Sequence, residues 1–79
     1  MYNVLLNGVV VAEGLSNGEL NQFLLDIFSE SKYTKENLIE AYKSFGFEER
    51  NFEDFIYNNE IKTPLDFSLG NDQFSLKEG

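Results

Sequence analysis

The sequence predicts an α+β fold in which two β-hairpins form an antiparallel sheet and two or three helices pack on one face. Three observations predict it. Two-residue turn signals, Asn7-Gly8 and Gly70-Asn71, lie near the two ends of the sequence, each between apolar runs. Between them, two segments carry apolar residues at helical spacing after an N-capping residue. Because 79 residues have room for one hydrophobic core, we expect a single domain over residues 1–79.

The first hairpin is predicted from the stretch YNVLLNGVVVAE. Asn-Gly suits a type I′ turn, because both central residues of that turn take positive φ. Such a turn places Leu6 opposite Val9 and Val4 opposite Val11. Both faces of this hairpin are apolar near the turn, so we expect it to be covered on both sides or paired at the centre of the sheet.

A first helix is predicted over residues 17–30. Ser16 and Glu19 have the spacing of a capping box, and Leu15 and Leu20 occupy the hydrophobic-staple positions around it. Polar residues such as Asn21 are expected to lie away from the buried face. The apolar stripe consists of Leu20, Phe23, Leu24, Ile27 and Phe28.

A second helix is predicted to begin after the N-cap Thr34, with Tyr33 and Leu38 as its staple. Gly46 occupies the position of a left-handed C-terminal residue, from which Phe47 would fold back in a Schellman motif. The short connection between the two helices predicts an antiparallel arrangement. The inner stripe consists of Leu38, Ala41, Tyr42 and Phe45.

A short third helix is predicted after the N-cap Asn51, through about Tyr57, with Phe52, Phe55 and Ile56 pointing inward. Glu53 and Asp54 fall in its first turn, where carboxylates interact favourably with the helix dipole.

The second hairpin is predicted from LDFSL and DQFSL on either side of Gly70-Asn71. In that register Phe67 lies opposite Phe74 and Leu65 lies opposite Leu76. The intervening polar residues predict that the other face is wet. Pro64 indicates a strand start or an edge strand, because proline cannot donate a ladder hydrogen bond.

The composition removes most catalytic chemistry. Histidine and cysteine are both absent, so the chain lacks the usual neutral-pH general base, a thiol nucleophile and any Cys/His zinc site. No glycine-rich stretch forms a phosphate-binding loop, and no stretch matches a calcium-binding loop. We therefore expect no enzymatic activity and no cofactor.

Carboxylates leave two alternatives open. Asp26 with Glu30, and Glu36 with Glu40, are spaced i,i+4 on predicted helices, but no cleft that would shift a pKa is predicted around them. A shallow Mg²⁺ or Ca²⁺ site is the other alternative. Its ligands would be Glu48, Glu49, Glu53 and Asp54.

The strongest signal is charge. Fourteen acidic residues outnumber six basic ones, which gives a net charge of −8. Such a chain repels nucleic acid and anionic lipid and attracts basic surfaces. The acids concentrate around residues 48–60, with support from the second helix. We predict a partner-binding surface comprising Glu36, Glu40, Glu48, Glu49, Glu53, Asp54 and Glu60, with Tyr57 as an aromatic anchor.

In size, charge and organisation the chain resembles small acidic inhibitor proteins of phages and mobile elements, anti-CRISPR proteins among them, and acidic immunity proteins that block nuclease toxins. The resemblance implies a stoichiometric inhibitor. Its partner would be a basic protein, such as a nuclease or another nucleic-acid-binding protein, and it would not bind nucleic acid itself.

An alternative function is a structural, assembly or adaptor module that acts through an exposed strand edge or an apolar surface. The apolar runs are strand-sized, whereas a membrane span needs about 20 residues, so we expect no membrane association. The absence of cysteine suits a reducing cytoplasm.

Overall fold

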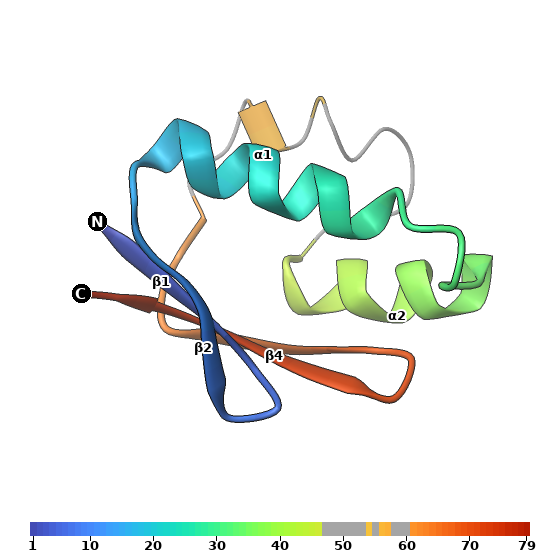
Figure 1. Ribbon diagram of the computed structural model, residues 1–79. Coiled ribbons are helices and arrows are strands. Elements are labelled where there is room, and N and C mark those ends of the chain that lie inside the picture. Colours follow the sequence, from blue (N-terminus) through green and yellow to red (C-terminus); the bar gives the residue numbers. More distant parts are fainter. Residues whose placement is uncertain (47–53, 55, 58–60) are drawn as a thin grey trace.

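The computed structural model describes residues 1–46, 54, 56–57 and 61–79, and it has the predicted α+β fold (Figure 1). The four strands are all antiparallel and follow the order β2-β1-β4-β3 across the sheet. Figure 1 shows the two helices on the same side of that sheet. The elements are β1 (Tyr2–Leu6), β2 (Val9–Leu15), α1 (Asn17–Phe28), α2 (Lys35–Ser44), β3 (Leu65–Leu69) and β4 (Asp72–Glu78).

The first hairpin has the predicted turn and part of the predicted register. Asn7 and Gly8 have φ values of 52° and 85°, as a type I′ turn requires, and Leu6 pairs with Val9. The pairing of Val4 with Val11 is wrong, because Val4 pairs with Ala12. A β-bulge after Val10 adds one residue to β2 and shifts the register.

The expected cover over this hairpin is found for only one of its strands. β1 is central, between β2 and β4, and Val4 is fully buried. β2 is an edge strand, and its first three residues are among the exposed large hydrophobic residues of the described part of the chain. The prediction is therefore wrong for β2. Both strands are apolar in sequence, but only β1 has a neighbouring strand on each side. The apolar pattern could not show that β2 would lie at the edge of the sheet.

The second hairpin has the predicted register, with Phe67 opposite Phe74 and Leu65 opposite Leu76. Gly70 has a φ of 65°, at the first central position of the turn, where type II′ turns favour glycine. β3 is the second edge of the sheet and begins directly after Pro64, as predicted.

The capping box at the start of α1 is confirmed. The Ser16 Oγ accepts a hydrogen bond from the Glu19 N–H at 3.2 Å, and the Glu19 carboxylate accepts one from the Ser16 N–H at 2.8 Å. The helix ends at Phe28, two residues before the predicted end. Ser29 is its C-cap, because the Ser29 hydroxyl donates to the Asp26 carbonyl at 2.8 Å and so satisfies one terminal acceptor.

Asn21 corrects the predicted outer face of α1. The side chain is only 5% exposed, although it was expected to face water. Asn21 precedes Leu24 by three residues and Phe28 by seven, and these spacings place it on their side of the helix. The buried face of α1 is therefore wider than the single predicted stripe.

α2 begins and ends as predicted. Thr34 and Asn37 form a reciprocal capping box, with hydrogen bonds of 3.1 Å and 3.0 Å. Gly46 follows the C-cap with a φ of 76°. Ala41 is fully buried. The predicted Schellman contact of Phe47 lies outside the described residues.

The core lies between the helices and the sheet, and aromatic rings connect its layers. The Phe28 ring of α1 is 5.5 Å from Tyr42 of α2 and 5.8 Å from Phe67 of β3. Phe67 stacks on Phe74 at 5.1 Å. The buried apolar residues are Val4, Leu20, Leu24, Ile27, Phe28, Ala41, Ile56, Ile61, Phe67, Leu69, Phe74 and Leu76.

The predicted third helix is described only in part. Asp54, Ile56 and Tyr57 have helical backbone, and Ile56 is buried as expected, with 1% of its surface exposed. The other residues of the predicted span, including Phe52 and Phe55, lie outside the described residues.

Candidate functional site

Two of the predicted partner-binding carboxylates lie on α2. Glu36 is in its first turn and Glu40 lies one turn later, and both side chains are exposed. The Glu40 carboxylate forms an ion pair with the Lys43 ammonium at 3.2 Å. Because 71% of the Glu40 side chain is exposed, this surface pair contributes little to stability and leaves the carboxylate accessible to a partner.

Asp54 and Tyr57 are exposed at the other described part of the predicted surface. Tyr57 is 56% exposed, which suits a rigid aromatic anchor beside carboxylates. Glu48, Glu49, Glu53 and Glu60 lie outside the described residues. The structure therefore places four of the eight predicted residues.

The described residues hold no group of three or more acidic residues with the arrangement of a metal site. Of the four ligands suggested for a shallow cation site, only Asp54 is described. On α1, the Asp26 carboxylate accepts a hydrogen bond of 2.9 Å from the Gln22 side chain. This i,i+4 contact lies along the surface of α1 and accounts for Asp26 as a residue that stabilises the helix.

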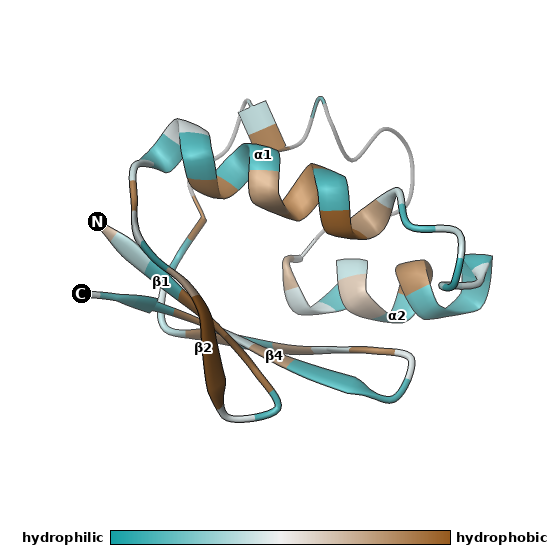
Figure 2. Ribbon diagram, viewed as in Figure 1, coloured by the Kyte–Doolittle hydropathy of each residue, from teal (hydrophilic) through white to brown (hydrophobic). Residues whose placement is uncertain are grey.

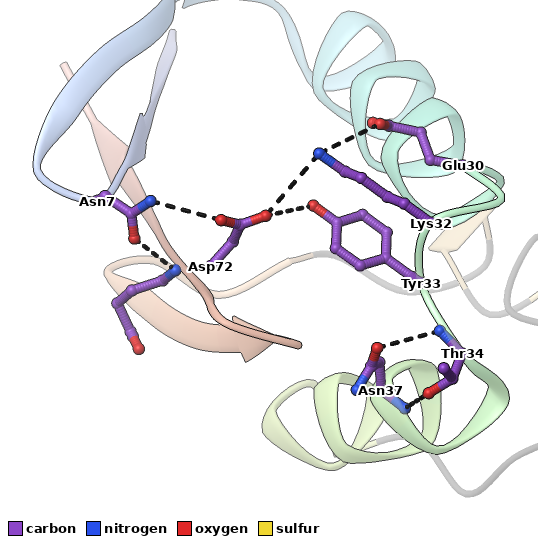
Figure 3. A network of polar contacts seen from close by, with 8 residues as sticks. Asn7, Glu30, Lys32, Tyr33, Thr34, Asn37 and Asp72 are labelled. Carbon is purple, nitrogen blue, oxygen red and sulfur yellow. Dashed lines mark hydrogen bonds and ion pairs between the residues drawn. The ribbon is translucent and has the colours of Figure 1, made fainter.

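A polar network joins both hairpin turns to the loop between the helices (Figure 3). The Tyr33 hydroxyl donates to the Asp72 carboxylate at 2.8 Å, and the Lys32 ammonium lies 4.0 Å from the same oxygen. The Asn7 amide donates to the other Asp72 oxygen at 3.5 Å and accepts from the Gln73 N–H at 2.9 Å. Asp72 therefore ties the helical layer to the ends of the sheet.

Among the residues that the structure describes, three side chains have shifted pKa values, and each shift has a structural cause. Burial and the neighbouring Asp72 carboxylate raise the pKa of the Tyr33 hydroxyl well above its usual 10. Burial also raises the pKa of Tyr42. The backbone hydrogen bond from Ser16 lowers the pKa of Glu19 below 4.5. These shifts reflect packing and capping, and they do not assemble a catalytic acid–base pair.

The sequence interpretation offered an exposed strand edge as an alternative binding site but did not locate it on β2. Val9, Val10 and Val11, which we call the valine edge, are 65%, 51% and 46% exposed. They form the start of β2 at the free side of the sheet, and Figure 2 shows β2 as a hydrophobic strand there. Natural edge strands are commonly protected by charges or proline, and neither occurs in this run.

Charged side chains are absent from the first hairpin up to Ala12. Residues 1–12 contain no Asp, Glu, Lys or Arg, although the chain carries a net charge of −8. This segregation is visible in the sequence, but it does not distinguish a buried strand from an exposed edge, so only the strand order located the valine edge. The acidic and apolar surfaces are therefore separate candidate sites.

Neither helix of the described part of the chain is long and apolar enough to cross a membrane. The fold and the two surfaces are the basis for assigning a function, because comparison with models of protein families, with curated proteins and with solved structures finds no match.

Proposed function

We propose that this protein is a non-enzymatic acidic binding protein that inhibits a nucleic-acid-handling protein. It occupies the basic nucleic-acid-binding surface of that partner, in the manner of anti-CRISPR proteins or nucleic-acid mimics. The observation that carries the proposal is a net charge of −8 on 79 residues, with carboxylates concentrated between residues 48 and 60 of the sequence. The exposure of Glu36, Glu40 and Asp54 is consistent with it.

The physical basis is electrostatic complementarity on a fixed frame. Carboxylates one helical turn apart, such as Glu36 and Glu40, are roughly 6 Å apart, close to the spacing of phosphates along a nucleic acid strand. Their field speeds association with a cationic surface and weakens with added salt. Because surface charges alone contribute little affinity, Tyr57 supplies the desolvated anchor.

The test begins with capture of partners from host lysate on the immobilised protein and elution with a salt gradient. The captured protein is then purified and bound to a fluorescent oligonucleotide. We expect the acidic protein to displace the oligonucleotide, as measured by fluorescence anisotropy. We expect the triple variant Glu48→Gln, Glu49→Gln and Glu60→Gln to need at least a tenfold higher concentration for the same displacement.

The matched control removes the same amount of charge elsewhere. Glu13→Gln, Asp66→Asn and Glu78→Gln also reduce the net charge from −8 to −5, but on the strands. We expect this control to displace the oligonucleotide within about threefold of the unmodified protein. Equal losses in the two variants would show that only total charge matters, and unchanged displacement by the first variant would reject the acidic binding surface.

A second candidate function is favoured by the valine edge: a structural or adaptor module that binds through β2. An unprotected edge can accept an additional strand, and its main-chain groups provide affinity while side chains provide specificity. In the same capture experiment, Val10→Lys would then abolish binding at every salt concentration. The triple charge variants would bind normally.

A further inference from the structure

We infer that β2 is a self-association edge at which a second copy of this chain pairs antiparallel through the valine edge. The two four-stranded sheets then form one continuous sheet of eight strands. This inference rests on the second candidate function, the strand-edge module, and is independent of the acidic binding surface. It names the occupant of that edge.

The backbone at the centre of the valine edge is available for pairing. In a two-residue hairpin the residues on either side of the turn, here Leu6 and Val9, exchange the hydrogen bonds between strands. The next residue, Val10, therefore directs its N–H and C=O away from β1 and toward the free edge. Its side chain is 51% exposed, on the face of the sheet that is away from the helices.

The other edge of the sheet is less suited to pairing. β3 follows directly on Pro64 and carries Asp66, and both features are known to discourage strand addition. α2 also packs against β3. An additional strand is therefore better accommodated at β2.

The charge pattern favours a second copy as the occupant, because that copy presents the same uncharged apolar edge. Two chains of net charge −8 repel each other, so a stable contact needs surfaces without opposing carboxylates. Residues 1–12 carry no acidic or basic side chain, and Glu13 is the only charged residue in β2. The first hairpin is thus the part of the described chain on which two copies can meet with least repulsion.

A specific register follows. When Val10 lies opposite Val10 of the second copy, Val9 of each copy lies opposite Val11 of the other copy. Apolar side chains therefore meet apolar side chains across the two-fold axis. The two Glu13 residues then lie three positions from the centre in opposite directions, roughly 20 Å apart at about 3.4 Å per residue. This separation exceeds the Debye length of about 8 Å at physiological ionic strength.

The helices permit this arrangement. Antiparallel pairing places both helical layers on the same face of the joined sheet. Each α1 follows Leu15 at the far end of β2, so the two α1 helices begin at opposite ends of the new strand pair. The bulge after Val10 restricts the regular pairing to a few residues, which makes the interface smaller than the roughly 800 Å² per partner of standard complexes.

The experiment is sedimentation equilibrium on the full chain from about 10 µM to 1 mM, the range expected for a small interface. We expect the apparent mass to rise from 9.1 kDa toward twice that value. Raising NaCl from about 50 to about 500 mM is expected to tighten the dimer at least threefold, because salt screens repulsion between like-charged chains. Binding to a basic partner should instead weaken as NaCl is raised, so the effect of salt distinguishes the two kinds of binding.

Two variants locate the interface. Val10→Lys should raise the dissociation constant at least tenfold, because it places two like charges together at the centre of the pair. Ser68→Lys makes the same charge change on the exposed side of β3 and should leave the constant within about twofold. Slowed hydrogen exchange at the Val10 N–H in the concentrated sample would confirm the register.

A chain that stays monomeric at about 1 mM in high salt overturns self-pairing, as does a Val10→Lys variant that folds and still dimerises normally. Circular dichroism establishes the fold of each variant. If Val10→Lys does not fold, Val10→Thr keeps the branched shape and should weaken the dimer about threefold or more. The strand-edge module itself fails separately, when Val10→Lys captures its heterologous partner unchanged.

Discussion

At the scale of the residue, Asp72 is the described side chain on which most tertiary polar contacts converge. Its carboxylate accepts from the Tyr33 hydroxyl and the Asn7 amide, and it lies within 4.0 Å of the Lys32 ammonium. The side chain is 28% exposed, so these hydrogen bonds are partly shielded from water. The network fixes the loop before α2 against both turns of the sheet, and the Tyr33 ring adds an apolar contact with the core.

Tyr33→Phe tests this network. The variant keeps the ring but leaves the Asp72 oxygen without its donor, so we expect a loss of about 1 kcal/mol in the free energy of unfolding, measured with urea at pH 7. Tyr57→Phe is the control, because Tyr57 is 56% exposed and should change stability by less than about 0.5 kcal/mol. Equal stability of the two variants would contradict a structural role for Asp72.

The Tyr33 hydroxyl also illustrates what the sequence cannot provide. Its ring was predicted as a hydrophobic-staple residue from its place before Thr34. The partner of its hydroxyl is 39 residues away, on a strand whose position depends on the whole fold. Asn21 shows the reverse case, since its burial was available from its spacing to Leu24 and Phe28, although polarity argued for the surface.

At the scale of the element, both helices begin with reciprocal capping boxes, but only one of them contains an ionisable group. The box of α1 uses Glu19, and the box of α2 uses Asn37. The Ser16 hydrogen bonds lower the pKa of Glu19 below its unfolded value near 4.5. A lowered folded pKa means that the stabilisation is present above that unfolded value and is lost as pH falls through the folded pKa.

The loss of stability caused by Glu19→Ala should therefore depend on pH, whereas the loss caused by Asn37→Ala should not. At pH 7 each should lower the urea midpoint, because each removes one half of a capping box. As pH falls below about 4.5, the deficit of Glu19→Ala should shrink, because the unmodified protein loses the same carboxylate interaction. The deficit of Asn37→Ala should stay constant, and a parallel decline in both variants would contradict the assignment to Glu19.

The two hairpins explain how far sheet register can be predicted. In the second hairpin each strand alternates apolar and polar residues, so a shift of one residue would bury the polar set, and the predicted register was correct. In the first, Val9 to Ala12 is apolar throughout, and sliding by one residue has little consequence for burial. The bulge after Val10 was therefore invisible to the pattern, as was the exposure of the valine edge.

At the scale of the whole molecule, the order of the elements along the sequence predicted the α+β architecture. Hairpin, helices and hairpin in that order lead to one layer of helices on one antiparallel sheet, since the helices and the second hairpin each have one strongly apolar face. The pairing of β1 with β4, which puts the Gly79 N–H 2.9 Å from the Met1 carbonyl, is a long-range event that neither hairpin specifies. Strand order then determined which edge remained open.

Net charge gives a final prediction at this scale. Because −8 charges on a small fold repel one another, added salt should stabilise the monomer by screening. At about 5 µM protein, below the range expected for self-association, we expect the urea midpoint to rise between about 20 and 300 mM NaCl. The strand control, with Glu13, Asp66 and Glu78 neutralised to a net charge of −5, should gain less. A midpoint that falls with salt would show that local ion pairs, such as Lys43 with Glu40, outweigh the collective repulsion, which is contrary to the small stabilisation expected of exposed pairs.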